Sequence, residues 1–152
     1  MGTKIVVSTN ANVACGGATP KSVLGYKAPS GIAARVLRYG VSLNGTSSTD
    51  ARAKVDFLKK PSTAGTATDI STEIAVVSGK TTSLGNAFQS YNVGFEPGQD
   101  GSSRVLRSHL MAPTGPFETL AGIDLDPAEL ITLRVYDASG KECRAWMEVE
   151  LG

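Results

Sequence analysis

The apolar residues of this chain come in short runs in which they alternate with polar residues, and this spacing limits the possible folds more than any other feature. A period of two places successive side chains on opposite faces of an extended strand. The clearest runs cover residues 33–43, 51–59, 131–136 and 142–151. Each run therefore predicts a β-strand with one buried face.

The alternation also predicts which side chains point into the core. In the first run, Leu37 to Leu43 is the expected core face, and Arg35 belongs to the same face. The intervening residues, among them Val36, Asp56 and Arg134, are expected on the outer faces. The other predicted core residues are Ala53, Val55, Phe57, Ile131, Leu133, Val135, Cys143, Ala145, Met147, Val149 and Leu151.

Turn signals between these runs predict two hairpins. Asn44-Gly45 follows the first run at once, and this dipeptide favours a tight turn because both residues accept a positive φ. Residues 51–59 would then be the returning strand. Asp137 to Gly140 separates the last two runs, so residues 131–136 and 142–151 are expected to pair in the same way.

Weaker apolar pieces complete the pattern. Strands are expected at residues 5–7, 23–27, 74–77, 91–95 and 104–112. The only helical signal is Asp126 to Leu130, where Asp126 would cap a single turn that begins with Pro127. About eight or nine strands with almost no helix predict an all-β fold, an antiparallel β-sandwich of jelly-roll type.

The length of 152 residues fits a single domain that covers residues 1–152. Residues 61–103 are rich in Ser, Thr and Gly, which predicts loops and edge strands. We interpret residues 1–12 as a candidate N-terminal contact arm, which together with parts of residues 61–103 would touch a surrounding protein shell or neighbouring copies of the chain.

Charge and hydropathy exclude several classes of function. The 15 Lys and Arg residues nearly balance the 14 Asp and Glu residues, which argues against a general nucleic-acid binder. The apolar run Ile5-Val6-Val7 is too short for a signal peptide, and no stretch approaches the length of a membrane span. We therefore expect synthesis in a cytoplasm and no membrane partner.

The two cysteines, Cys15 and Cys143, lie near opposite ends of the chain. Two buried free thiols are the favoured interpretation, and a disulfide that closes the termini is the alternative. Neither cysteine belongs to a C-x-x-C pair, so zinc and redox roles lack their usual support.

The sequence offers no constellation for catalysis, a cofactor or a metal. His109 is the only histidine, and a satisfied or exposed strand histidine is the expected role. Ser78 to Thr81 imitates the end of a phosphate-binding loop, but we interpret it as a turn with a solvated Lys80. Asp124, Asp126 and Glu129 match no calcium loop of defined geometry. The protein is predicted not to be an enzyme.

Basic residues form mild clusters. Strand-face charges that protect sheet edges are the favoured interpretation, and complementarity to an acidic protein surface is the alternative. The residues concerned are Arg35, Arg38, Arg52, Lys54, Lys59, Lys60, Arg104 and Arg107.

Several segments together resemble a family of small structural proteins of tailed bacteriophages. The pattern combines a strand, a Gly-Thr-Ser-Ser-Thr turn and a return strand that ends in Ser-Thr-Ala-Gly-Thr. Its parts here are APSGIAARVLRYGVSLNGTSST at residues 28–49, STAGTAT at 62–68, FEP at 95–97, LITLRVYDAS at 130–139 and RAWMEVE at 144–150.

This resemblance implies a decoration or cement protein with a β-sandwich fold. Such a protein binds the outer surface of the major capsid protein shell, often as a trimer, and stabilises the assembled particle without covalent chemistry. The expected location is the virion, after synthesis in the host bacterial cytoplasm. A tail or baseplate component and a carbohydrate-binding module of the virion surface are the alternatives.

Overall fold

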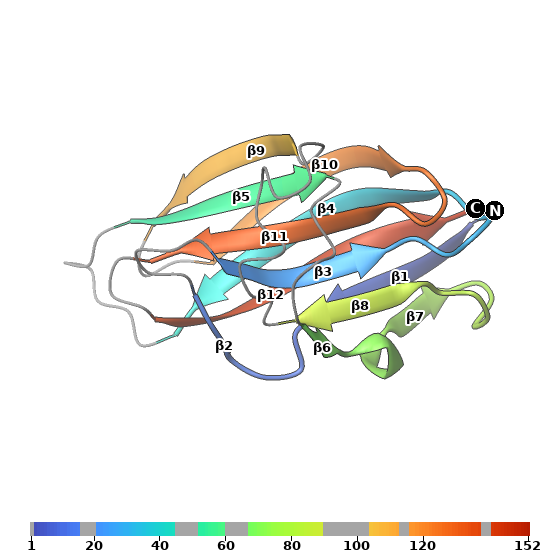
Figure 1. Cartoon of the computed structure of the whole chain (residues 1–152), viewed down its shortest axis with the longest axis horizontal. Coiled ribbons are helices and arrows are strands. Elements are labelled where there is room, and N and C mark those ends of the chain that lie inside the picture. The colour runs from blue at the N-terminus through green and yellow to red at the C-terminus, as the bar shows by residue number, and fades with distance from the viewer. Residues whose placement is uncertain are drawn as a thin grey trace.

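The computed structural model describes residues 2–15, 21–44, 52–59, 67–89, 104–112, 116–137 and 141–152. These residues contain twelve β-strands and one short 3-10 turn, η1 (Ser71–Glu73). Two antiparallel sheets pack face to face around one core (Figure 1). The predicted all-β antiparallel sandwich is confirmed, with more strands than the eight or nine expected.

Each sheet has six strands. Sheet A contains, from edge to edge, β10 (Phe117–Leu125), β4 (Ala34–Leu43), β12 (Glu142–Leu151), β1 (Thr3–Ser8) and β7 (Ala75–Ser78), and the short β2 (Val13–Ala14) also pairs with β12. Sheet B contains β6 (Thr68–Asp69), β8 (Asn86–Gln89), β3 (Lys21–Lys27), β11 (Leu130–Tyr136), β5 (Ala53–Lys59) and β9 (Arg104–Met111).

No two of the described strands that follow each other along the chain pair with each other. Eight strands have the order of a jelly roll, with β1, β12, β4 and β10 in sheet A and β3, β11, β5 and β9 in sheet B. Along the chain these eight strands alternate between the sheets except at β5 and β9, which pair with each other in sheet B. β7 extends sheet A beyond β1, and β8 and β6 extend sheet B beyond β3.

Both predicted hairpins are wrong. β4 pairs with β10 and β12, whereas β5 pairs with β9 and β11, so the two strands lie in different sheets. β11 and β12 are separated in the same way. The apolar side of a strand is buried whether the strand pairs with its predecessor in one sheet or crosses to the facing sheet. The alternation of apolar and polar residues therefore does not distinguish the two arrangements. Gly45 and residues 138–140 lie outside the described part of the chain.

The predicted core face of β4 is right in its second half and wrong in its first. Val36 is fully buried and Arg35 is exposed, whereas Tyr39 and Val41 point inward as expected. The cause is a β-bulge at Leu37, where the register with β12 shifts by one residue. An extra residue reverses the alternation, and a one-residue shift exchanges the two faces.

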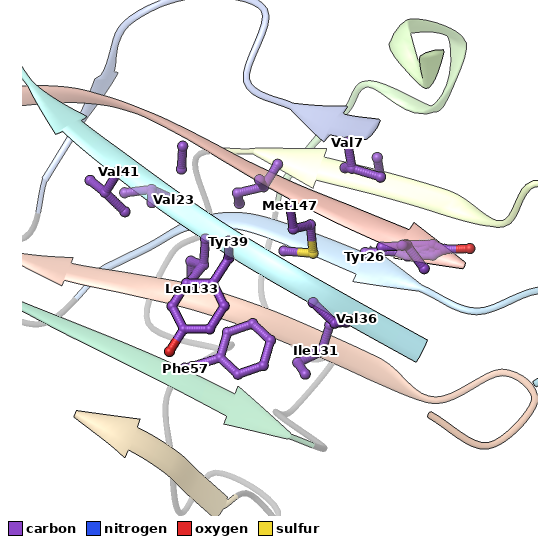
Figure 2. Close-up of a cluster of buried hydrophobic side chains, with 14 of the residues drawn as sticks. Val7, Val23, Tyr26, Val36, Tyr39, Val41, Phe57, Ile131, Leu133 and Met147 are labelled. Carbon is purple, nitrogen blue, oxygen red and sulfur yellow. The ribbon is translucent and has the colours of Figure 1, made fainter. Parts of the chain in front are cut away.

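The other predicted core residues are all buried. Figure 2 shows Phe57, Ile131, Leu133 and Met147 of this set between the sheets. Tyr39 from sheet A stacks on Phe57 from sheet B with a ring separation of 4.3 Å. Leu133 and Met147 fill the space beside this pair and are completely buried. The two sheets are therefore joined mainly by apolar contacts.

Other expectations have mixed outcomes. The strands at residues 5–7, 23–27, 74–77 and 104–112 are present as β1, β3, β7 and β9, and residues 91–95 lie outside the described residues. Residues 126–130 form a turn rather than a helix, with Ala128 at φ 64°. The backbone N–H of Asp126 donates to the Glu129 carboxylate at 2.9 Å, which reverses the expected capping role. β10 was not predicted.

The segment interpreted as a contact arm, residues 1–12, contains a core strand. β1 pairs with β12 at six positions, and Ile5 and Val7 are completely buried. This pairing builds Thr3–Ser8 into sheet A, whereas Asn10, Ala11 and Asn12 are exposed. Residues 61–103 were expected to contain edge strands. Within this range, β6 and β7 lie at the edges of sheet B and sheet A.

Replacing Phe57 with Ala tests the contact between the sheets. We expect the free energy of unfolding to fall by about 3–5 kcal/mol, because the substitution empties space under the Tyr39 ring. Urea denaturation followed by circular dichroism measures this change. The matched control is Val77→Ala on the exposed face of β7, with an expected change of less than about 0.5 kcal/mol. Equal losses in the two variants would contradict the assignment of the core.

Candidate interaction surface

The two sides of the sandwich end differently. On one side the sheets end in long strands, β9 with 8 residues and β10 with 9 residues, which lie next to each other (Figure 1). On the other side they end in β6 and β7, with 2 and 4 residues. We call the first the β9/β10 side. Its outer strand edges pair with no other described strand, so it is the largest open edge of the described fold.

Large apolar side chains are exposed on the β9/β10 side. Leu120 of β10 is 82% exposed, Leu110 of β9 is 65% exposed and Val105 of β9 is 44% exposed. Long edge strands with exposed apolar residues readily pair with another chain, so native proteins rarely leave them uncovered. This combination is what a protein-binding surface requires.

An aromatic cluster closes the gap between the two edge strands. The Tyr39 hydroxyl lies 3.1 Å from His109 Nε2, and the His109 ring lies 4.8 Å from the Phe117 ring. Burial raises the pKa of Tyr39 to about 12. His109 is thus a hydrogen-bonded strand histidine, in agreement with the favoured interpretation of the sequence.

Four of the eight basic residues that the sequence singled out form ion pairs with acidic groups in the described part of the chain. Arg38 binds Glu148 at 2.7 Å and Glu118 at 3.0 Å, and its pKa is raised by the hydrogen bond to Glu148. The other pairs are Arg35 with Asp124 at 3.2 Å, Lys59 with Glu129 at 3.3 Å and Lys54 with Asp56 at 3.9 Å. This pattern agrees with strand-face charges that are matched within the fold.

Of the other four basic residues, the structure describes the side chains of Arg107 and Arg52. Arg107 is exposed on β9, where its guanidinium donates to the Leu106 carbonyl, and Arg52 is exposed before β5. Lys60 and the side chain of Arg104 lie outside the described part of the chain. Arg107 is therefore the described cation best placed for a partner at the β9/β10 side.

The residues considered as metal or phosphate ligands have other roles in the structure. Asp124 and Glu129 form the ion pairs given above, and no group of three potential ligands gathers among the described residues. Ser78 to Thr81 follows β7, with Gly79 at φ 102°, and the Lys80 backbone N–H donates to the Thr3 hydroxyl at 3.0 Å. This segment has no helix after it, as expected for a turn.

A buried ion pair was missed by the sequence analysis. Arg134 Nη2 lies 2.7 Å from Asp56 Oδ2, and the Ser108 hydroxyl donates to the other oxygen of Asp56 at 2.7 Å. Asp56 and Arg134 are buried although both are on the outer face of sheet B, opposite each other in β5 and β11. The sequence signal for this pair was the presence of opposite charges at outward positions of two predicted strands, Asp56 in residues 51–59 and Arg134 in residues 131–136.

Among the described residues, Trp146 is the aromatic residue on the outer face of sheet A. Trp146 lies across Gly40, where a Cβ atom would approach the indole to 2.7 Å. The Arg38 guanidinium lies 5.6 Å from the centre of the indole ring. The ring is thus held between a glycine, which leaves room for it, and a cation that is already paired with acids.

The fold and this surface define a β-sandwich domain with one open side. Comparison with models of protein families, with curated proteins and with solved structures gave no match to the chain. No described helix is long and apolar enough to cross a membrane.

Breaking the buried ion pair should be costly. We expect Asp56→Ala to lower the free energy of unfolding by about 3–5 kcal/mol, because Arg134 would remain buried without this carboxylate. Asp124→Ala removes the partner of Arg35 at the surface and should cost less than about 1 kcal/mol. Chemical denaturation of both variants measures the difference, and similar losses would argue against a buried pair.

Alkaline pH should destabilise the fold through Tyr39. Its folded pKa of about 12 exceeds the ordinary value of 10.0, so its contribution is complete below pH 10 and is lost as the pH rises toward 12. In Tyr39→Phe the free energy of unfolding should fall less steeply between pH 9 and pH 11.5 than in the wild type. Urea denaturation at several pH values tests this, and equal slopes would contradict it.

Proposed function

We propose that the protein is a virion structural protein, a decoration or cement protein that binds the outer surface of a tailed-phage capsid. The resemblance of residues 28–49, 62–68, 95–97, 130–139 and 144–150 to phage structural proteins supports the virion. The single structural observation that supports binding by protein contact is the open β9/β10 side, with its exposed Leu110 and Leu120.

The proposed partner is the major capsid protein. Leu110 lies opposite Lys54 on the outer face of sheet B, and Leu120 lies opposite Arg38 on the outer face of sheet A, so the two leucines flank the β9/β10 side. An apolar cleft of the shell that receives this side would cover both leucines, and an acidic group of the shell would pair with Arg107. Each leucine that is fully buried on binding contributes about 1.5–3 kcal/mol, which corresponds to roughly tenfold or more in affinity. A few such anchors suffice, because most of the energy of an interface resides in few residues.

Binding alone accounts for the proposed stabilisation of the shell. A protein that binds the assembled state and not its dissociated parts favours that state by RT ln(1 + [L]/Kd) at each site. A capsid repeats the same site many times, so a modest contribution per copy adds up over the particle. We further propose a trimer as the binding unit, in which each copy presents its own β9/β10 side.

A carbohydrate-binding module remains the second candidate, and Trp146 is the observation that favours it. An indole on an open sheet face is a typical platform for a sugar ring. Its proximity to Arg38, which lies 5.6 Å from the ring centre, makes the face less accessible than the leucines of the β9/β10 side. Capsid binding is therefore the function supported best. A glycan array distinguishes the two, since only the alternative predicts a signal that Trp146→Ala abolishes.

Co-sedimentation with purified capsid shells that lack the protein tests the proposal. The double variant Leu110→Asp/Leu120→Asp should bind at least about 100-fold more weakly than the wild type, because two anchors are lost. Both side chains are exposed, so the fold should be retained, which circular dichroism checks.

Val77→Asp on β7 is the matched control, with a side chain of similar exposure at the other side of the sandwich. It should bind like the wild type. Undiminished binding of the double variant would refute the assignment of the surface. Binding to isolated tails rather than capsid shells would favour a tail or baseplate component. The mass of the purified protein in solution tests the trimer.

A further inference from the structure

The fold brings the two cysteines together from opposite ends of the chain. β2 pairs with β12, with Val13 opposite Cys143 and Ala14 opposite Glu142. The Cys15 backbone N–H donates to the Lys141 carbonyl at 2.9 Å, which continues the ladder by one residue. Cys15 is therefore the diagonal neighbour of Cys143 across two antiparallel strands.

Both thiols point toward the core. Val13, Cys15 and Cys143 are all buried, with exposures of 2%, 6% and 0%. Both cysteines are free, and the two thiols lie close enough for Cys15 to affect the titration of Cys143. Two neighbouring thiols on one face of a strand pair can be joined by a disulfide when the backbone adjusts to bring their Cα atoms within bonding range.

We propose that Cys15 and Cys143 are a site of disulfide formation that fastens the N-terminal segment to the last strand. The oxidant is a small-molecule disulfide such as oxidised glutathione. The two protein thiols are oxidised, the glutathione disulfide is reduced, one protein S–S bond forms and one glutathione S–S bond breaks. Two molecules of reduced glutathione leave with the two thiol protons.

The structure indicates the order of the two exchange steps. Cys143 is completely buried in β12 between β2 and β4, and its interaction with Cys15 and its burial raise the pKa of its thiol, so Cys143 is a poor first nucleophile. β2 contributes only 2 residues, and detachment of so short a strand exposes Cys15 without unfolding the sheets. Cys15 then forms the mixed disulfide, and Cys143 displaces glutathione when β2 returns.

The bond would close a loop that contains most of the chain, and long loops give the largest loss of entropy in the unfolded state. The disulfide would also have a consequence for the virion, and this consequence alone rests on the proposed function. A virion leaves a reducing cytoplasm for an oxidising exterior. Each decoration copy would thus be fastened after release of the particle.

Oxidation of the folded wild-type protein with oxidised glutathione at pH 8 tests the site. Intact-mass spectrometry should show the loss of two hydrogens with no retained glutathione. The midpoint of thermal unfolding should rise by roughly 5–15 °C and return to its initial value with dithiothreitol. These readouts need no variant.

Cys143→Ser is the matched control. It should retain one glutathione on Cys15 and show no reversible rise in the midpoint. Cys15→Ser should react much more slowly, because only the deeply buried Cys143 remains. Wild-type protein that keeps two free thiols, or that forms only intermolecular disulfides, would overturn the proposal. Capsid co-sedimentation of the reduced protein is independent of this result, so the two proposals can fail separately.

Discussion

The structure depends on the position of β12 in the middle of sheet A. This strand pairs with β4 on one side and with β1 on the other, and its five inward side chains are nearly or completely buried. Because every other described strand lies between β1 and β12 in the sequence, β1 gains this partner only after those strands have been synthesised. All described strand pairs are non-local, which makes ordered loop closure the main barrier to folding.

The outer faces of the two sheets differ in how their charged side chains are paired. Sheet A exposes a network of surface charges in which Arg38 joins Glu118 and Glu148 across three strands. Sheet B instead buries the ion pair of Asp56 and Arg134, and removal of one of these two charges would leave the other buried without its main counter-charge. The hydrogen bond from Ser108 attaches the edge strand β9 to this pair. The buried charges thus fix the register of β9, which supports the open side of the sandwich.

The periodicity of the sequence predicted most of the strands and their buried faces. It did not predict which strands pair with each other, because the partners are distant in the sequence. The alternation from Cys143 to Leu151 identified both faces of β12 correctly, because that strand has no internal irregularity. The bulge at Leu37 reversed the faces in the first half of β4, and no local signal distinguishes a bulge from regular alternation. The Asn44-Gly45 turn indicated where the strand ends but not which sheet comes next. Burial of Asp56 and contact between Cys15 and Cys143 follow only from those long-range pairings.

Irregularities in both edge strands limit how another chain can bind the β9/β10 side. The register with β5 shifts at Leu106, and the register with β4 shifts between Leu120 and Ile123. Bulges twist an edge away from continuous pairing and so suppress indiscriminate aggregation. The longest regular stretches of these two edge strands are residues 107–111 and 117–120, which include Leu110 and Leu120. A partner can therefore gain much of its affinity from these two side chains and only a short stretch of backbone pairing, which favours one defined docking geometry over open-ended sheet extension.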